Sequence, residues 1–404
     1  MTPFRNDIRW KIRKRQSISG AICSTVALTL LFGLTSFTLA GQSGKNDLKG
    51  VKLKDVTFTG SRQGQAVGFV DIDGDGIDDK MVGAPYASVS SRAGALLVYQ
   101  GRAGGEFSET PAMILTGDDN YGYSFVNLGD VDSDGKEDFA VAALNGDGQE
   151  VSLSCSATVH QGGRNRNWGN GKGKVIAKLA GEEPMDKFGL FVSKGDLNND
   201  GLQDLIVGAP FHTEDPAVYQ GGAVYVIFAP DFSERITLHA TAQNKGLGWS
   251  AAAGDMNGDR IADLCMSASG AVLCYYGAPD FTPATDSPDL TIRSASKGFG
   301  KALAVADVSG DGTGDLVVGA PNAVIAGARD TGSIYVVAGG PELGTMTVDT
   351  PSPALIARID GAALFDRFGS SLAAVDGGES GQATALVVGS PMADLDSLNH
   401  LTGK

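Results

Sequence analysis

The sequence is short of the residues on which many enzymes depend. Aromatic residues make up 7% of its 404 positions, and the chain holds four histidines. Neither the HExxH motif of zinc proteases nor the GxSxG motif of serine hydrolases occurs. His160, His212, His239 and His400 are scattered, without the spacing of a metal site or a catalytic pair. We therefore expect no catalytic residues, and the sequence favours a binding protein over an enzyme.

Cysteine is equally scarce, with four residues in the chain. Cys265 and Cys274 are symmetric about Ser269 and Gly270, so a hairpin there would set them opposite each other. Two outcomes fit this placement, a cross-strand disulfide and a pair of buried thiols. Cys155 has no evident partner, and Cys23 lies in the N-terminal segment.

Long uncharged runs are also rare, and the main one spans residues 16–44, after six basic residues. A basic head, an apolar middle and a small-residue exit at Thr38-Leu-Ala40 predict a cleaved signal peptide over residues 1–40. The uncharged stretch is also long enough for an uncleaved membrane anchor. Both alternatives place the protein outside the cell, in the periplasm or on the cell surface. Residues 41–50 are predicted as a linker, and residues 51–404 as one domain.

Positive charge is in short supply. The chain carries a formal charge of −15, and loss of residues 1–40 would remove six basic residues and one acidic residue, leaving −20. So acidic a surface repels nucleic acid and anionic membranes and favours cations or basic partners. We therefore expect no nucleic-acid partner, and membrane contact only through an uncleaved N-terminal segment.

What the sequence does contain is an acidic loop, best formed at residues 196–204, which precedes an apolar run. Oxygen side chains occupy its first, third, fifth and ninth places, a pattern that can surround a calcium ion. The sixth-place glycine permits the left-handed backbone of a sharp turn. An EF-hand would need a glutamate at the twelfth place, which is Val207. The loop therefore belongs to another class of calcium site.

Five good copies of this loop occur, and their first aspartates lie 52 to 66 residues apart. We expect strong calcium sites in the first three and weaker ones in the fourth and fifth, where Arg260 replaces glycine and Ser309 replaces a ligand. A sixth, worn copy begins at Asp376 and is expected to bind no ion. The predicted ligands are Asp71, Asp73, Asp75, Asp79, Asp130, Asp132, Asp134, Asp138, Asp196, Asn198, Asp200, Asp204, Asp255, Asn257, Asp259, Asp263, Asp307, Asp311 and Asp315.

Each loop sits inside a longer repeat with the same parts in the same order. A short alternating run comes first, followed by an aromatic-glycine or similar pair, a small-residue strand, the loop, an apolar strand and a further strand. The apolar strand ends in Gly-Ala-Pro at residues 83–85, 208–210 and 319–321, and in Gly-Ser-Pro at 389–391. Four short β runs per unit predict a small antiparallel sheet, which several units can bury by radial stacking. The sequence therefore predicts an all-β fold, a β-propeller of about six four-stranded blades.

The aromatic-Gly, Asp-loop and Gly-Ala-Pro units resemble the FG-GAP repeats of the integrin α-subunit propeller over residues 51–404. This resemblance implies a seven-bladed propeller with calcium on one face and a protein or glycan ligand on the other, and a secreted or surface adhesion module. A phospholipase D-like extracellular hydrolase, which carries propellers of this type, is the alternative.

The repeat departs from the family pattern at its ends. Six units are visible, and the last stops before its third strand. A six-blade ring with a gap and a truncated seven-blade relative both fit. A strand around residues 55–59 could close the ring by pairing with the last blade.

Overall fold

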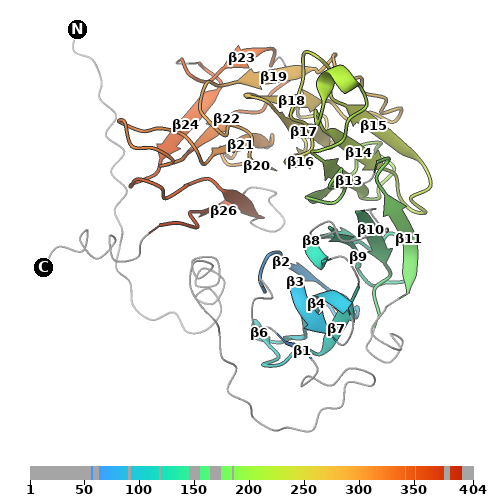
Figure 1. The fold of residues 1–404 in the computed structure, drawn as a ribbon. Helices are drawn as coiled ribbons and strands as arrows, with labels where there is room; N and C mark the ends of the chain where they lie inside the picture. The colour runs from blue at the N-terminus through green and yellow to red at the C-terminus, as the bar shows by residue number, and fades with distance from the viewer. Residues whose placement is uncertain are drawn as a thin grey trace, which may run out of the picture.

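The protein is built from small antiparallel sheets set around a common centre (Figure 1). The computed structural model describes residues 56–57, 63–89, 92–117, 120–144, 155–163, 174–183, 186–341, 343–350, 352–376 and 383–393. The predicted signal segment and linker lie outside these residues. Across the described ranges, no helix has both the length and the apolar character needed to cross a membrane.

Five four-stranded sheets are complete, each with its strands joined in sequence order, and one parallel pairing of Gly94 with Tyr121 joins the first two into a larger sheet. The first consists of β2 (Val67–Val70), β3 (Asp79–Val89), β4 (Arg92–Tyr99) and β7 (Met113–Thr116). The second consists of β8 (Tyr121–Gly129), β9 (Asp138–Ala143), β10 (Ser156–His160) and β11 (Val175–Ala180). The third consists of β12 (Val192–Gly195), β13 (Asp204–Ala209), β14 (Ala223–Ile227) and β15 (Arg235–His239).

The remaining sheets repeat this order. The fourth consists of β16 (Ala251–Gly254), β17 (Asp263–Ala268), β18 (Ala271–Tyr275) and β19 (Leu290–Arg293). The fifth consists of β20 (Ala302–Ala306), β21 (Asp315–Ala320), β22 (Ser333–Val337) and β24 (Leu355–Asp360). Of the sixth, the structure describes β25 (Ser371–Asp376) and β26 (Ala383–Gly389). The predicted all-β propeller is confirmed.

The first strand of every sheet is the innermost. Each of these strands contacts the first strand of the next sheet, in the order β2, β8, β12, β16, β20 and β25. Small residues make this approach possible: β16 is Ala-Ala-Ala-Gly, and the ideal Cβ of Gly254 would lie 2.6 Å from a Val305 methyl group. The expectation that small-residue strands line the axis is confirmed.

The second and third strands of each sheet form the core. All residues of β13, β14, β17, β18, β21 and β22 are buried. Their side chains fill the spaces between neighbouring sheets; Tyr225 and Phe188, for example, pack with ring centroids 5.0 Å apart. Apolar burial between sheets is therefore what stabilises the ring.

The two glycine motifs of the repeat meet between neighbouring sheets. A Cβ on Gly208, from Gly-Ala-Pro, would lie 2.3 Å from the carbonyl oxygen of Gly248, from the next Leu-Gly pair. Gly83 meets Gly122 and Gly319 meets Gly369 in the same way. The second glycine of each pair also has φ between +78° and +87°, which disfavours side chains. These positions therefore need glycine because two backbones touch there.

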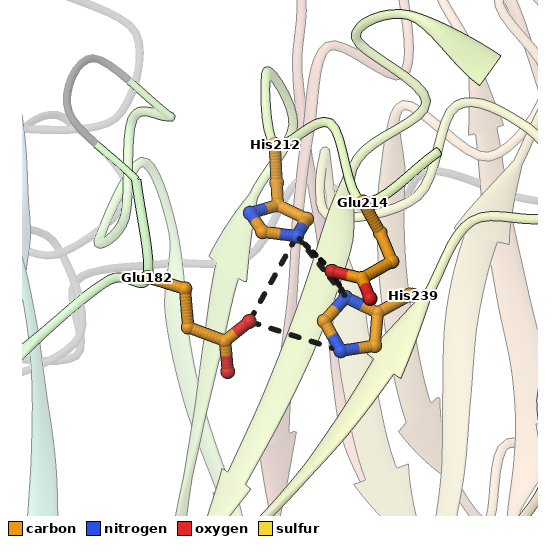
Figure 2. A group of neighbouring side chains, drawn as sticks. All are labelled: Glu182, His212, Glu214 and His239. Carbon is orange, nitrogen blue, oxygen red and sulfur yellow. Dashed lines mark hydrogen bonds and ion pairs between the residues drawn. The ribbon is translucent and has the colours of Figure 1, made fainter. Parts of the chain in front are cut away.

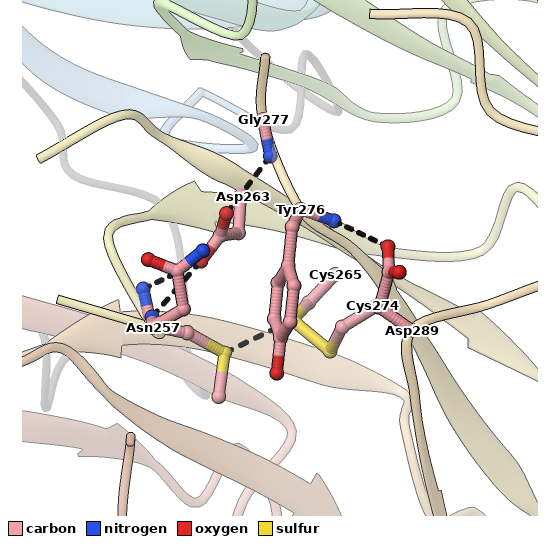
Figure 3. The surroundings of a disulfide bond; sticks show 8 residues. Asn257, Asp263, Cys265, Cys274, Tyr276, Gly277 and Asp289 are labelled. Carbon is pink, nitrogen blue, oxygen red and sulfur yellow. Dashed lines mark hydrogen bonds between the residues drawn. A yellow bond between two sulfur atoms is a disulfide. The ribbon is translucent and has the colours of Figure 1, made fainter. Parts of the chain in front are cut away.

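The hairpin between β17 and β18 brings Cys265 and Cys274 opposite each other, and they form a disulfide (Figure 3). Of the two outcomes left open by the sequence, the bonded pair is the one found. Cys155 is a buried thiol outside this bond.

Three short strands were not anticipated, and a fourth, expected near the N-terminus, has another partner. β5 (Gly101–Arg102) and β6 (Glu106–Phe107) form a small hairpin, and β23 (Met346–Thr347) runs parallel to β19. β1 (Val56–Thr57) pairs with Val89 and Ser88 of β3. The hypothesis that this N-terminal strand pairs with the last sheet is therefore wrong. β2 pairs with β3 only as far as Val82, and β1 pairs with the part of β3 beyond it.

Candidate metal sites at the two ends of the propeller

The five predicted calcium loops all lie at one end of the propeller. Each joins the innermost strand of a sheet to the second strand, as residues 196–203 join β12 to β13. Because every sheet runs in the same direction, every loop emerges at the same end.

The first aspartate of each loop organises the backbone around it. In the third loop, Asp196 Oδ1 accepts a hydrogen bond from Asp200 N at 3.0 Å, and Oδ2 accepts one from Gly201 N at 3.0 Å. Asp200 Oδ1 in turn accepts from Leu202 N at 2.8 Å. The loops beginning at Asp71, Asp130, Asp255 and Asp307 repeat this pattern. The loop shape is thus set by its own carboxylates.

The ninth aspartate joins the loop to the rest of its sheet. Asp204 is fully buried; its Oδ2 accepts from Leu197 N at 3.1 Å, and its Oδ1 from Ala229 N at 3.2 Å, beyond β14. Burial raises its pKa to about 6, although the two backbone hydrogen bonds oppose this shift. Burial raises the pKa of three equivalent residues, Asp79, Asp138 and Asp263, to about 6 as well. This carboxylate therefore links loop, strand and turn.

The first two loops gather the most carboxylates. Asp71, Asp73 and Asp75 have oxygens within 4.8 Å of one another, as do Asp130, Asp132 and Asp138. These groups could hold a metal ion. In the second loop, however, Lys136 Nζ lies 2.7 Å from Asp134 Oδ2, and Gln161 Nε2 donates to the same oxygen at 2.8 Å. An ion entering this loop has to displace an ammonium group from Asp134.

The third and fourth loops have an amide at the third place. Asn198 Nδ2 donates to Asp200 Oδ2, and Asn257 Nδ2 donates to Asp259 Oδ2, both at 2.9 Å. The amide oxygens accept from the backbone N–H groups of the same two aspartates. Each amide has to turn before its oxygen can bind an ion.

The fourth and fifth loops keep the common backbone despite their substitutions. Arg260 takes the sixth place with φ +72° and donates its N–H to Asp255 Oδ2 at 2.8 Å. Ser309 donates its backbone N–H to Asp315 Oδ2 at 2.7 Å. The sixth loop begins at Asp376, and its remaining residues lie outside the described part of the chain.

Backbone hydrogen bonds connect the loops of neighbouring sheets. The N–H of the eighth residue in a loop donates to the carbonyl of the first aspartate in the preceding loop: Glu137 to Asp71 at 3.1 Å, Ala262 to Asp196 at 3.2 Å, and Gly314 to Asp255 at 2.7 Å. An ion that rigidifies one loop would therefore also strengthen its contact with the next sheet.

The other end of the propeller holds a second kind of polar cluster, formed by Glu182, His212, Glu214 and His239 (Figure 2). Glu182 follows β11, His212 and Glu214 lie between β13 and β14, and His239 ends β15. Ala209, Ala223 and His239 pair across the third sheet at the end away from its Asp loop. The sequence spacing of His212 and His239 did not predict this proximity, which the fold creates.

The cluster has short distances between its donor atoms. His212 Nε2 and His239 Nδ1 lie 3.1 Å apart. Glu214 Oε2 lies 3.7 Å from the first and 3.8 Å from the second. Glu182 Oε2 lies 3.9 Å from His212 Nε2. Two imidazoles and two carboxylates thus converge on one small volume.

The sequence offered a weak signal for this cluster. His212 and Glu214 follow Gly-Ala-Pro210 closely, but His239 lies 27 residues beyond His212. No short motif joins them, since their proximity depends on how β13, β14 and β15 pair. His160 has a different environment: it is buried, and its Nε2 lies 2.8 Å from the Tyr121 hydroxyl.

The same end carries several exposed apolar side chains. Tyr219, Trp249, Leu364 and Phe365 are between 36% and 74% exposed, and all lie on connections that leave the sheets away from the Asp loops. Phe211 packs edge-on against Trp249, with ring centroids 5.6 Å apart. This end therefore offers large apolar side chains to solvent, beside the His–Glu cluster.

Comparison with known families identifies the repeat. A model of the FG-GAP repeat matches residues 188–227 and 299–337. Each match begins at an aromatic-glycine pair and ends with the third strand of a sheet. The chain therefore contains FG-GAP repeats.

Two kinds of protein are among its relatives. Phosphatidylinositol-glycan-specific phospholipase D of Rattus norvegicus is 30% identical over 234 residues, 52% of this chain and 27% of the relative. Integrin alpha-3 of Cricetulus griseus is 31% identical over 179 residues, 43% of this chain and 16% of the relative. Integrin alpha-5 of Xenopus laevis is 32% identical over 223 residues, 50% of this chain and 20% of the relative. The matches cover between 16% and 27% of the length of these relatives.

Proposed function

We propose that this FG-GAP propeller is an exported ligand-recognition module. Calcium in the Asp loops holds its sheets together, and the opposite end binds a protein or glycan, as in an adhesion protein. The exposed apolar side chains at that end, above all Tyr219 and Phe365, are the observation that carries the proposal.

Calcium fits the Asp loops because their donors are all oxygens, the ligands that this hard ion prefers. The carboxylates are held in place by loop N–H groups, as Asp196 is by Asp200 and Gly201. Carboxylates fixed in this way are arranged for an ion before it arrives. The backbone bonds between neighbouring loops give the ion a structural task, which is to fix one sheet to the next.

Recognition at the opposite end is supported by the apolar side chains exposed there. Tyr219 is 74% exposed, and Leu364 and Phe365 are 52% and 51% exposed. Exposed aromatic side chains are enriched among the residues that contribute most to protein interfaces. Exposure of apolar side chains of this size to water is unfavourable. A partner that covers them removes apolar area from water, which lowers the free energy of the complex.

The calcium part of the proposal is tested by thermal unfolding. Calcium that binds the folded chain alone raises its stability by mass action, about 2.7 kcal/mol for a site at a free concentration one hundred times its Kd. We expect the melting temperature to fall by several degrees in excess chelator and to return when calcium is restored. An unchanged melting temperature would refute a structural role for calcium.

The recognition part is tested by a pull-down with the immobilised protein, with and without calcium, followed by affinity measurements on the ligand it retains. We expect the double variant Tyr219→Ser/Phe365→Ser to bind that ligand at least about tenfold more weakly, the loss typical of two interface aromatics. Val175→Ser is the matched control, because Val175 is exposed at the Asp-loop end. Equal losses in both would contradict the placement of the binding surface.

The alternative, a hydrolase related to phospholipase D, is tested separately. The purified protein is screened against phosphodiesters and glycosides, with calcium present. We propose that it has no such activity. Turnover that survives repurification and is lost on denaturation would favour the enzyme.

A further inference from the structure

We propose that His212, His239, Glu214 and Glu182 form a zinc-binding site at the end of the third sheet opposite its Asp loop. The site is separate from the calcium loops in position and in chemistry, and it does not depend on the proposed role of calcium.

The geometry of the cluster is close to that of a tetrahedral zinc site. Donor atoms about 2.0 Å from zinc at the corners of a tetrahedron lie about 3.3 Å apart. His212 Nε2, His239 Nδ1 and Glu214 Oε2 form a triangle with sides of 3.1, 3.7 and 3.8 Å. A contraction of about half an ångström along two sides, available to an exposed glutamate, completes the arrangement.

Glu182 supplies the fourth donor and is held in position by its neighbours. Its Oε1 accepts hydrogen bonds from Arg235 Nη2 and Thr237 Oγ1, both at 3.1 Å. Its Oε2 is left facing the two rings, 3.9 Å from His212 Nε2 and 3.8 Å from His239 Nε2, and the four donor residues each have an atom within 4.8 Å of the others. Figure 2 shows this oxygen directed at both histidines. Arg235 and Thr237 come from β15, the strand that ends at His239, so one strand positions two of the four donors.

The environment of His212 points to a ligand independently of these distances. Its side chain is 1% exposed, and its Nδ1 has no hydrogen-bond partner among the described residues. Glu183 Oε2 lies 3.8 Å from this nitrogen. Metal-bound histidines commonly donate their second N–H to a carboxylate, which fixes the tautomer and the ring. With zinc on Nε2, the proton of His212 resides on Nδ1 and faces Glu183.

The charge around the rings also favours a cation. Glu182, Glu183 and Glu214 each bring a carboxylate oxygen within 4.0 Å of a ring nitrogen. Arg235 offsets one of the three. A divalent ion placed between the rings would neutralise the other two.

The donor set selects zinc over the ions expected at the other end. Imidazole nitrogen suits zinc and the neighbouring transition metals, whereas calcium and magnesium prefer sites made of oxygen alone. The propeller would thus bind two different cations at sites with different donor atoms, calcium in the Asp loops and zinc at the His–Glu cluster.

The test is equilibrium dialysis of the full chain against zinc, after stripping with chelator and return to saturating calcium, which keeps the Asp loops occupied. We expect one zinc ion per chain. The double variant Glu214→Gln/His239→Gln should bind it more than about 100-fold more weakly, since loss of an outer partner alone costs 10–100-fold. Glu183→Gln, which changes such an outer partner, should weaken it about tenfold.

Two controls keep the result decisive. Glu234→Gln removes one charge from the same sheet at the Asp-loop end and should bind zinc like the wild type. Because the side chains of Glu214 and His239 are 61% and 29% exposed, we expect their variants to fold, and a melting temperature in excess chelator equal to that of the wild type verifies this.

The proposal is overturned if the wild type binds no zinc below about 10 μM, or if the double variant retains the wild-type stoichiometry and affinity. Cobalt(II) adds a check on geometry, because a four-coordinate site gives an intense visible absorption that the double variant should lack. These outcomes leave the calcium proposal untouched, since that is measured by calcium-dependent stability without zinc.

Discussion

The two ends of the third sheet bring their candidate metal ligands together in different ways. At one end, the four predicted calcium ligands lie within the nine residues from Asp196 to Asp204. At the other, Glu182 and His239 lie 57 positions apart, Glu182 after β11 and His239 at the end of β15. The difference shows that a loop can specify a site through its own backbone, whereas the His–Glu cluster exists only if three strands pair correctly.

The His–Glu cluster depends on the register of the strands in the third sheet. His239 pairs with Ala223, and Ala223 pairs with Ala209. A shift of one residue in β15 would turn His239 to the other face of the sheet. The Asp loop would survive such a shift, because the hydrogen bonds of Asp196 lie within the loop.

The largest expected effect comes from the residue that connects the Asp loop to its sheet. Asp204→Ala leaves the buried N–H groups of Leu197 and Ala229 without acceptors. At about 1–3 kcal/mol for each buried unsatisfied group, we expect a loss of about 3 kcal/mol in the free energy of unfolding. Urea denaturation in excess chelator measures this loss without the contribution of calcium.

Asp231→Ala serves as the control, since Asp231 is exposed at the same end of the same sheet. It should lower the urea midpoint much less than Asp204→Ala does, because the hydrogen bonds that Asp231 accepts from Ser233 N and Oγ are exposed to solvent. A loss from Asp204→Ala no greater than that of the control would show that the ninth aspartate does not hold the loop.

The next largest loss of stability is expected from removal of the disulfide, which lies at neither end of the propeller. Replacing Cys265 and Cys274 with alanine removes a cross-link from the middle of the fourth sheet. Chain entropy for a loop of about ten residues predicts a loss of about 2.5 kcal/mol. Chemical denaturation should show the same loss for the reduced wild type. The calcium and zinc responses should both persist, and a variant that lost either one would link the disulfide to that end.

A smaller effect is expected from pH at the Asp-loop end. Because burial raises the pKa of Asp204 and its three equivalents to about 6, protons compete with calcium below that value. The calcium-dependent gain in melting temperature should be full above pH 6 and shrink as the pH falls through 6. At pH 5 the competition amounts to about tenfold in affinity, or about 1.4 kcal/mol, for each site.

The calcium-free chain should respond to pH in the opposite direction. Its folded state takes up protons on these aspartates near pH 6, whereas the unfolded state does so near 3.8. Stability should therefore rise as the pH falls from about 6 towards 4. Burial lowers the pKa of His160 to about 4, and this single group opposes the trend. Melting curves from pH 5 to pH 8, with and without chelator, check both directions.

The smallest effect distinguishes one Asp loop from the others. Lys136→Gln removes the ammonium group that contacts Asp134 in the second loop. Because exposed ion pairs are weak, calcium should bind this loop only about two- to fivefold more tightly. Isothermal calorimetry can compare the variant with Lys245→Gln, which removes an equal charge at the other end. Identical calcium affinities in the two variants would show that Lys136 does not compete with the ion.

Much of the fold could be predicted because its signals are local and repeated. The Gly-Ala-Pro and aromatic-glycine motifs mark strand ends, and their glycines are required where neighbouring backbones touch, as Gly208 and Gly248 do. The β1 strand could not be placed in this way. Val56 and Thr57 carry no signal that selects one strand edge over another, and in the structure they pair with Val89 and Ser88 of β3.

The candidate sites also differ in whether local sequence or tertiary pairing forms them. The sequence by itself determined the Asp loops, since a carboxylate at the first place and N–H groups three to five residues later meet within one turn of the backbone. Only the tertiary structure decided the His–Glu cluster and the disulfide. Their partners are brought together by pairing between strands, and pairing depends on the burial of whole sheets against one another rather than on any short stretch of chain.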